Sequence, residues 1–475
     1  MLVKTPSLLT AAGVVALSSI IAATPVTNII SKDVVVVGGG AAGAYAAVRL
    51  REDYGQSIVL IEKEGLLGGA VNTWTDPKTG TPYELGVEAF LDYGKAREFF
   101  ARFNVSVNPS TQESVITRHA DFTTGHWVNY TAPTAAEQFA AFEKYVKLAE
   151  QYEDMMLPGL WNFPVPGSIP EDLLLNFGDF AKKHGIEAAV PRIWEIAAVS
   201  LGDLKTQPTF YVLQSFPAPL ARVFIGKGQT LYVASHRNQD IYDKVSQLLG
   251  DDVLYSSVVV RGHRTSKAVK VVAKHKDGHL TEIRAKRLLI AIPPTVANLS
   301  PFSLDKHEFR VLSKTLFTQA YAGGVASSNL PLNTSVINTA ASGDWLDYPN
   351  FSLQQWYKSM DSAASYHKVM MFGDESLDSK GAKTVVEQSY KRLVEAGSLP
   401  EASGKGLEWL EFAEHGSVNV RSSLEDLKAG FIQELYSLQG HLSTWYTGAA
   451  WSAQLHTPTW AFSDTVVPRL VESLN

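Results

Sequence analysis

Glycines spaced as in a nucleotide-binding loop follow an apolar run near the start of the chain. The run Val34–Val37 leads directly into Gly-Gly-Gly-Ala-Ala-Gly, which fits the pattern G-x-G-x-x-G at Gly38, Gly40 and Gly43. In such a loop the first glycine allows a tight turn, the second lets the backbone approach a pyrophosphate, and the third lets a helix pack against a strand. The segment therefore predicts a dinucleotide-binding site.

The residues around this loop supply the elements that such a site needs. Residues 41–51 are expected to form a helix, whose first residues, Ala41 and Ala42, would offer unpaired N–H groups and the positive end of the helix dipole to the phosphates. Residues 57–61 are expected to form a second buried strand, and Glu62 ends it, placed to accept hydrogen bonds from ribose hydroxyls. The alternative is a glycine-rich turn in an ordinary α/β domain, which the combination of loop, helix, strand and acid disfavours.

Three further segments resemble those of a known family. Residues 62–73 contain the glycine pair Gly68 and Gly69, and residues 83–90 contain Glu-Leu-Gly-Val-Glu. Near the other end, Trp-Tyr-Thr-Gly-Ala-Ala at residues 445–450 precedes Thr-Trp-Ala-Phe-Ser at residues 459–463. With the first loop, these segments resemble the amine-oxidase-like superfamily of FAD flavoproteins, and within it the secreted fungal members similar to β-cyclopiazonate dehydrogenase.

The resemblance implies that FAD is the cofactor and places residues along it. Beyond the first loop and Glu62, the implied cofactor-binding residues are Lys63, Gly69, Ala70, Gly86, Val87, Val258 and Gly448. Val258 would contact adenine through its backbone, whereas Gly448 would lie under the flavin. Trp460 would face the isoalloxazine ring as the catalytic residue, although a core tryptophan at the start of the last helix is an equally good interpretation.

The same resemblance implies an α/β fold, in which a Rossmann-like FAD-binding domain of the amine oxidase type is interleaved with an α+β substrate domain. Within the FAD-binding domain, Lys-Asp-Gly-His at residues 276–279 predicts a hairpin turn. The predicted segments are a signal peptide (1–23), three FAD-binding parts (31–110, 220–300 and 431–475) and two substrate-domain parts (111–219 and 301–430).

The N-terminus predicts passage through a secretory pathway. Lys4 precedes an apolar stretch at residues 8–23 that ends in small residues, which fits a signal peptide better than a membrane anchor. Sequons for N-glycosylation suit this location and lie at Asn104, Asn129, Asn298, Asn333 and Asn350.

The chain has no cysteine, so a cysteinyl link to the flavin is excluded, and its histidines show no spacing typical of a metal site. We therefore predict no metal.

Size and charge bound the remaining possibilities. A chain of 475 residues with 45% hydrophobic content can form about two or three domains. A net charge of −6 with both signs mixed gives no electrostatic reason to propose a nucleic-acid partner.

Aromatic residues gather in residues 157–166 and at Trp345, Tyr348, Phe351, Trp356 and Tyr357. They could line a tunnel for a hydrophobic small molecule, although core packing accounts for each of them equally well.

The predicted activity is FAD-dependent oxidation of a hydrophobic specialised metabolite, by dehydrogenation or oxidative cyclisation, with molecular oxygen as one candidate electron acceptor. The alternatives are a secreted flavin amine oxidase acting on a simple amine, and a non-catalytic lipid or ligand carrier of the same fold, such as the GDP-dissociation inhibitors of prenylated small GTPases. An NAD-only dehydrogenase is a third alternative, which leaves the C-terminal motif unexplained.

Two departures from the family pattern bear on this choice. Ala70 replaces the arginine that usually follows the second glycine pair, and residues 316–321 lack the lysine that many amine oxidases carry on the strand after the double proline, here Pro293-Pro294. The missing lysine weakens the case for a simple-amine oxidase. The intact glycine motif, Glu62 and the predicted signal peptide weigh against a carrier.

Overall fold

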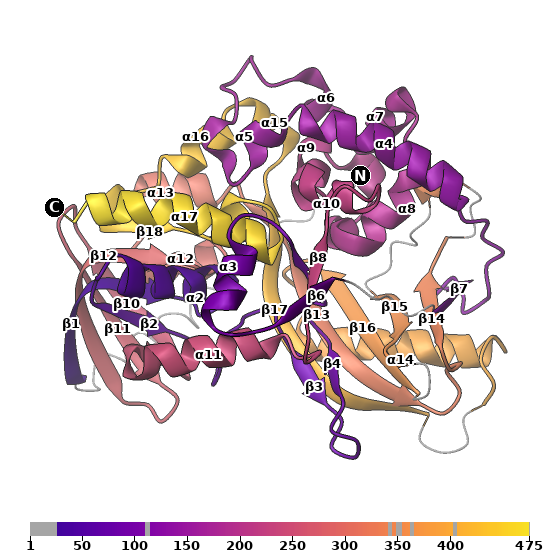
Figure 1. Cartoon of the computed structure of the whole chain (residues 1–475), viewed down its shortest axis with the longest axis horizontal. Coiled ribbons are helices and arrows are strands. Elements are labelled where there is room, and N and C mark those ends of the chain that lie inside the picture. The colour runs from indigo at the N-terminus through magenta and orange to yellow at the C-terminus, as the bar shows by residue number, and fades with distance from the viewer. Residues whose placement is uncertain are drawn as a thin grey trace, which may run out of the picture.

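The computed structural model describes residues 26–109, 115–340, 344–347, 354–361, 365–401 and 406–474. The predicted signal peptide, the sequon at Asn350, and the aromatic residues Tyr348 and Phe351 lie outside these ranges. Two large β-sheets lie at opposite sides of the described molecule, each with its own covering helices (Figure 1).

The larger sheet is built from widely separated parts of the chain. β1 (Val26–Val37) pairs in parallel with β12 (Leu280–Ile290) on one side and with β2 (Ile58–Ile61) on the other. The strand order is β10-β11-β12-β1-β2-β9, and β18 also pairs with β12. The remaining strands are β9 (Val253–Leu254), β10 (Ser257–Arg264), β11 (Val269–His275) and β18 (Thr444–Tyr446).

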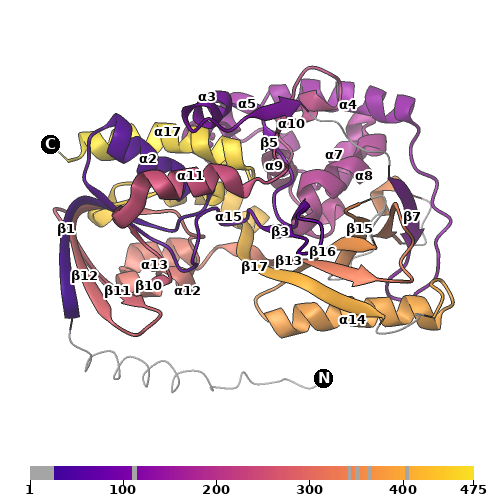
Figure 2. The ribbon, with the colours of Figure 1, turned by 60° about the horizontal axis from the view of Figure 1, so that its bottom comes forward.

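The centre of this sheet is covered, which explains why its parallel strands are apolar throughout. Every residue of Val34–Val37 and of Ile58–Ile61 is buried, as expected for strands packed on both faces. Helices α2 (Ala41–Val48), α11 (Gln239–Leu249) and α17 (His456–Glu472) lie together on one side of it (Figure 2). A short π-helical segment (Arg49–Asp53) extends α2.

The hairpin turn predicted at residues 276–279 is confirmed. β11 ends at His275, the turn is closed by a hydrogen bond from Gly278 N–H to the His275 carbonyl, and β12 begins at Leu280. The apolar residues of the segment 253–260 predict a single strand, but the structure divides this segment into β9 and β10. Ser256, between them, has a φ of +48°, a left-handed conformation that interrupts an extended chain.

The second sheet has the order β17-β13-β16-β15-β14-β7, and only the β14–β7 pair is parallel. Its strands are β7 (Ile116–Ala120), β13 (Leu316–Ser327), β14 (Thr334–Asn338), β15 (Gln354–Ser359), β16 (Tyr366–Gly373) and β17 (Leu407–Arg421). Helix α14 (Ser379–Glu395) packs along this sheet through Ala382, Val386 and Leu393 (Figure 2). Trp356 and Tyr357 are buried in β15, which gives both of them a packing role.

Short helices gather above the second sheet (Figure 1). They are α4 (Ala135–Glu150), α5 (Glu153–Met156), α6 (Glu171–Leu174), α7 (Phe177–His184), α8 (Val190–Ile193), α9 (Thr209–Ser215) and α10 (Ala218–Val223). The spacing of Thr134 and Glu137 predicts a capping box at the start of α4, which is confirmed, because Thr134 accepts from Glu137 N–H and Glu137 accepts from Thr134 N–H. The spacing of Phe139, Phe142, Val146 and Ala149 predicts that they share one buried face of this helix. Phe139 is instead 47% exposed, and the buried face is formed by Ala141, Phe142, Tyr145, Val146 and Ala149.

Smaller elements complete the fold. Two small sheets join β3 (Thr73–Thr75) to β4 (Pro82–Glu84), and β5 (Phe90–Leu91) to β8 (Thr230–Val233) and β6 (Val107–Pro109). The other helices are α3 (Ala96–Arg102), α12 (Val296–Leu299), α13 (Lys306–Leu312), α15 (Leu424–Lys428) and α16 (Phe431–Tyr436).

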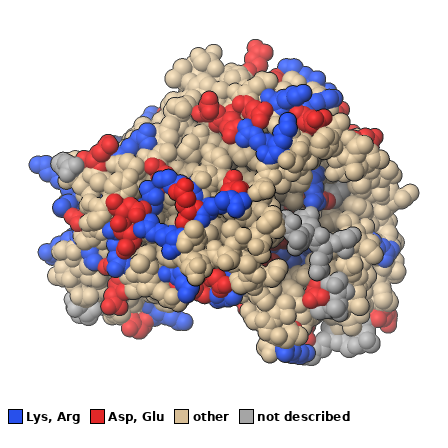
Figure 3. Space-filling model, in the orientation of Figure 1, with Lys and Arg blue, Asp and Glu red and all other residues tan. Residues whose placement is uncertain are grey.

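The described surface carries charges of both signs. Figure 3 shows Lys and Arg side chains interspersed with Asp and Glu side chains over one face of the molecule. In the part of the chain that the structure describes, no helix combines the length and the apolar character needed to cross a membrane.

Candidate functional site

The glycines of the first loop meet the steric requirements that their spacing predicts. Gly38 has a φ of +100°, and a Cβ atom on it would lie 2.7 Å from Cγ2 of Ile292. A Cβ atom on Gly43 would overlap the carbonyl oxygen of Gly38. Both positions therefore exclude a side chain, because the turn and the first turn of α2 are in direct contact with each other and with the end of β12.

Gly40 differs from these two glycines because the space beside it is open. A Cβ atom there would meet only the Cα of Gly69, at 3.5 Å. α2 begins at the next residue, Ala41, and no side chain caps its N-terminus. Unpaired N–H groups at a helix N-terminus next to open space form a site for an anion, and a pyrophosphate fits this description.

The second glycine pair packs directly against the first loop. Gly68 N–H donates to the Gly39 carbonyl at 2.9 Å, and a Cβ atom on Gly69 would lie 2.8 Å from the Cα of Gly40. Gly69 has a φ of +60°. The structure thus brings the two glycine segments together, and the contact requires that Gly69 has no side chain.

Glu62 closes β2 and connects three loops. Its buried carboxylate accepts from Gly39 N–H at 2.6 Å and from Glu64 N–H at 2.9 Å, while its carbonyl accepts from Ser257 N–H at 2.9 Å. Val258 follows and is 47% exposed, as a residue bordering an open site would be. The side chain of the predicted site residue Lys63 is 60% exposed. Hydrogen bonds from ribose to Glu62 and from adenine to Val258 stay predictions.

The loop at Gly86 and Val87 lies against the second glycine segment. Val87 N–H donates to the Ala70 carbonyl at 3.2 Å, and a Cβ atom on Gly86 would overlap that carbonyl group. On its other side the loop is held by Asn238, whose Nδ2 donates to the Val87 carbonyl at 2.7 Å. Gly86, Val87 and Ala70 therefore belong to one assembly with the first loop.

The C-terminal motif completes this assembly from the opposite side. Gly448 has a φ of +117°, and a Cβ atom on it would lie 4.0 Å from the Cβ of Ala42. α17 begins nearby at His456, and no side chain caps its N-terminus. The uncapped starts of α2 and α17 and the two glycine segments therefore border the same region.

Trp460 lies in a buried aromatic cluster. Its ring is 2% exposed, and Nε1 donates to the Ala41 carbonyl at 3.1 Å. The ring centroid lies 5.6 Å from that of Tyr45 and 4.8 Å from that of Phe99. These contacts give Trp460 a packing role behind the first turn of α2. A contact of Trp460 with the flavin stays a prediction.

Two half-buried histidines near this region were not predicted from the sequence. His456 opens α17 and packs against Phe90, with ring centroids 5.6 Å apart. Burial lowers the pKa of His456 to about 4, and burial together with the charge of Lys368 lowers the pKa of His415 to about 4. Both rings are therefore neutral at neutral pH. Neither residue belongs to a recognisable local motif, so no sequence signal could have identified them.

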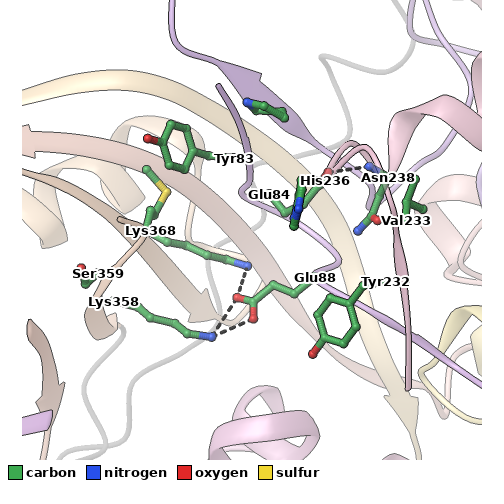
Figure 4. A pocket seen from close by; sticks show the side chains of 12 residues that line it. Tyr83, Glu84, Glu88, Tyr232, Val233, His236, Asn238, Lys358, Ser359 and Lys368 are labelled. Carbon is green, nitrogen blue, oxygen red and sulfur yellow. Dashed lines mark hydrogen bonds and ion pairs between the residues drawn. The ribbon is translucent and has the colours of Figure 1, made fainter. Parts of the chain in front are cut away.

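A cluster of charged side chains lies against the Gly86 loop, where a cavity of about 240 Å³ opens (Figure 4). Lys358 and Lys368 both reach the carboxylate of Glu88, and Lys368 Nζ also donates to the Gly86 carbonyl at 2.7 Å. This volume is below the roughly 300–1,000 Å³ of sites for drug-sized ligands, so the cavity does not hold a large substrate by itself.

The titration of these groups follows from their surroundings. Burial opposes ionisation of Glu88, but the ammonium groups of Lys358 and Lys368 outweigh it and hold the Glu88 pKa below its ordinary value. Burial lowers the pKa of Lys368, and Glu88 counteracts this effect. Burial raises the pKa of Glu84, also on the cavity wall, to about 7, although its carboxylate accepts from Asn238 N–H and the Thr73 hydroxyl.

One group of metal-ligand type occurs within the described residues, formed by Asp305, Glu308 and His441. Both carboxylate oxygens of Glu308 accept from the buried guanidinium of Arg264, at 2.6 and 2.7 Å. A cation there would meet this positive charge and compete for the same oxygens, so the donor set does not suit a metal.

Comparisons with known proteins agree with this assembly. A profile of the NAD(P)-binding Rossmann-like domain matches residues 36–103. The FAD-dependent oxidoreductase pigF of Monascus ruber is 34% identical over 89% of this chain and 88% of its own length. The β-cyclopiazonate dehydrogenase of Aspergillus oryzae is 30% identical over 94% of each chain.

Solved structures show the same fold at low identity. A fatty acid isomerase from P. acnes superposes with a TM-score of 0.70 at 18% identity, covering 92% of this chain and 98% of the isomerase. A putrescine oxidase bound to putrescine superposes with a TM-score of 0.60 at 16% identity, covering 94% of this chain and all of the oxidase. The predicted Rossmann-like fold of the amine oxidase type is confirmed.

Proposed function

We propose, because this chain belongs to the family of fungal FAD-dependent oxidoreductases that includes β-cyclopiazonate dehydrogenase, that it oxidises a hydrophobic specialised metabolite by dehydrogenation or oxidative cyclisation. The observation that carries the proposal is the open space at Gly40, bordered by the uncapped start of α2 and by the glycine pair at residues 68–69. The enzyme depends on FAD, and these are the residues that fit its pyrophosphate.

Bound FAD supplies the acceptor for a hydride taken from a substrate carbon. The chain's own residues hold and orient this cofactor. The first loop and Gly69 would hold the pyrophosphate, Glu62 the ribose, Val258 the adenine, and the segments at Gly86 and Gly448 the flavin. Reoxidation by molecular oxygen is part of the proposal.

A simple-amine oxidase is a weaker candidate. None of the residues in β13 is a lysine, although many amine oxidases place one on this strand. A lysine is present on the neighbouring strand β16, but Lys368 already donates to Gly86 and Glu88. A non-catalytic carrier is disfavoured because relatives that are named as oxidoreductases match this chain over nearly their whole length.

We also propose that the protein passes through a secretory lumen. Of the sequons in the described residues, Asn104 and Asn129 are exposed, whereas the amide of Asn298 is held by the Pro293 carbonyl at 3.0 Å. Treatment of the protein from its natural source with an N-glycosidase should reduce its mass and leave Asn104 and Asn129 deamidated. An unchanged mass would contradict this location.

The decisive experiment is anaerobic reduction of the bound flavin. Purified protein should be yellow, and acid denaturation should release FAD to the supernatant, because no cysteine is available to form a thioether link. FAD that stays with the precipitate would indicate a covalent link through histidine or tyrosine. Hydrophobic metabolites with an oxidisable C–H bond are then mixed with the holoenzyme without oxygen, alongside putrescine as a simple amine. Bleaching of the flavin band by the former but not by putrescine supports the proposal. Bleaching by putrescine alone would overturn it.

A further inference from the structure

Lys368 places a buried positive charge at the boundary between the two sheets' domains. The residue is 3% exposed and lies on β16 of the second sheet. Its Nζ donates to the Gly86 carbonyl at 2.7 Å and to the Glu88 carboxylate at 3.0 Å. A buried ammonium is unfavourable unless it is paired and hydrogen-bonded. Both of these partners belong to the loop after β4, so the charge acts on that loop.

The loop that Lys368 holds borders the cofactor region. Gly86 is in contact with the Ala70 carbonyl, and Ala70 follows Gly69, which touches the Cα of Gly40. Asn238 holds the same loop from α11 through the Val87 carbonyl. Two lysines, Lys358 and Lys368, reach this loop from the second sheet through Glu88, and Lys368 is the one that also binds the Gly86 carbonyl.

Two ammonium groups of the cluster around Lys368 share one carboxylate. Lys358 lies opposite Lys368 in the β15–β16 register, and both bind Glu88 (Figure 4). Like charges directly opposite each other destabilise a sheet, so the shared carboxylate is required to hold them. Glu84 also acts on Lys368, but burial raises the pKa of Glu84 to about 7, so at neutral pH it is only partly ionised and a net positive charge remains. The Lys358 side chain is 43% exposed and screened by water, whereas that of Lys368 is 4% exposed. The unscreened charge is therefore the one on Lys368.

We infer that Lys368 is a positioning residue for the flavin, which fixes the Gly86–Glu88 loop from the substrate domain and places a buried positive charge against the loop that would border the ring. This inference rests on FAD binding and on the Gly86 loop bordering the flavin, but not on the substrate proposed above. A positive charge there stabilises the reduced, anionic flavin relative to the oxidised one, because only the reduced form gains negative charge.

The test compares Lys368→Met with Lys358→Met, which removes an ammonium group from the same carboxylate at an exposed position. Midpoint potentials of the bound flavin are measured by dye equilibration at equal FAD occupancy. In Lys368→Met, binding of reduced relative to oxidised FAD should weaken about tenfold, a shift of about 30 mV to more negative potential for a two-electron couple. In Lys358→Met the change should be at most about twofold, and Lys368→Arg should restore the wild-type value.

An unchanged potential in Lys368→Met at full occupancy would overturn the inference, as would equal shifts in the two variants. If Lys368→Met does not fold, Lys368→Gln carries the same comparison, since its amide keeps a donor for the Gly86 carbonyl and lacks the charge. A wild-type protein without flavin would instead contradict FAD dependence itself, so the two failures are distinguishable.

Discussion

The indole N–H of Trp460 donates a hydrogen bond to the carbonyl oxygen of Ala41 across 419 residues of chain. The bond attaches α17 to the first turn of α2, directly behind the N–H groups that face the predicted pyrophosphate. The position of α17 and the predicted binding of the pyrophosphate are therefore connected through the buried side chain of Trp460.

Replacement of Trp460 by phenylalanine tests its two interpretations. The change removes the hydrogen bond to Ala41 and part of the packing against Tyr45, which should cost about 1–3 kcal/mol and lower the midpoint of thermal unfolding. If packing is its whole role, the rate of flavin reduction per bound FAD should stay at the wild-type value. The control is Trp161→Phe, which removes a hydrogen bond to Thr465 on the same helix. A changed rate at full occupancy in Trp460→Phe alone would restore the catalytic interpretation.

Gly40→Val should abolish FAD retention while leaving the chain folded. The first added atom meets only Gly69, at 3.5 Å, but the two methyl groups beyond it would fill the space needed by a pyrophosphate. FAD content per protein is measured from the absorbance of the purified variant. Gly65→Val is the matched control, since nothing lies within 4 Å of its added Cβ atom. Full flavin occupancy in Gly40→Val would show that the pyrophosphate lies elsewhere.

The carboxyl group of Glu84 should make stability depend on pH. Burial raises its pKa from 4.5 to about 7, so the native state binds the proton more tightly than the unfolded chain. Stability contributed by this group is then present at low pH and is lost as the pH rises from about 4.5 to 7. Each pKa unit is worth about 1.4 kcal/mol, which gives at most about 3 kcal/mol over this range.

Glu84→Gln keeps an oxygen that accepts from Asn238 N–H but does not ionise. The difference between the melting temperature of this variant and that of the wild type should therefore shift in favour of the variant from pH 5 to pH 8. Thermal unfolding at several pH values measures this difference. Parallel pH profiles for the two proteins would show that Glu84 ionises without cost in the folded state.

The ion pair between Arg264 and Glu308 should be essential for stability. Their side chains are 1% and 0% exposed, so Glu308→Ala would leave an unpaired guanidinium in the core and should destabilise the protein by about 3–5 kcal/mol. Urea unfolding followed by tryptophan fluorescence measures the change. Glu395→Ala, which breaks an exposed pair with Lys391, should cost no more than about 0.5 kcal/mol. Similar losses of unfolding free energy in both variants would contradict the essential role of the buried ion pair.

The features predicted correctly from individual residues are those with a local sequence signature. The glycine loop, the hairpin at residues 276–279 and the capping box at Thr134 each have such a signature within a few residues, although the loop also makes contacts far away in the chain. The exposure of Phe139 escaped prediction, because a helix with apolar residues on more than one side leaves its buried face to be chosen by tertiary packing.

The parts of the site that escaped prediction depend on long-range pairing. Lys368 meets Glu88 over 280 residues, and nothing in the sequence around either residue specifies the other. The pattern of many amine oxidases has a lysine on the strand that corresponds to β13, whereas this structure has its buried lysine on the adjacent strand, β16. The partners of Trp460 were unpredictable for the same reason, since its motif allowed a flavin contact and a core position equally.

The order in which the large sheet is assembled has a consequence for biosynthesis. β1 and β2 precede the other strands of this sheet in the chain, but β18 and α17, which complete the sheet and cover α2, follow all of those strands. An emerging polypeptide therefore exposes the apolar surface of α2 until residues 444–472 have left the ribosome. Chaperones of the cell would have to shield this surface during that part of translation, and the cofactor would enter only after α17 has packed against α2.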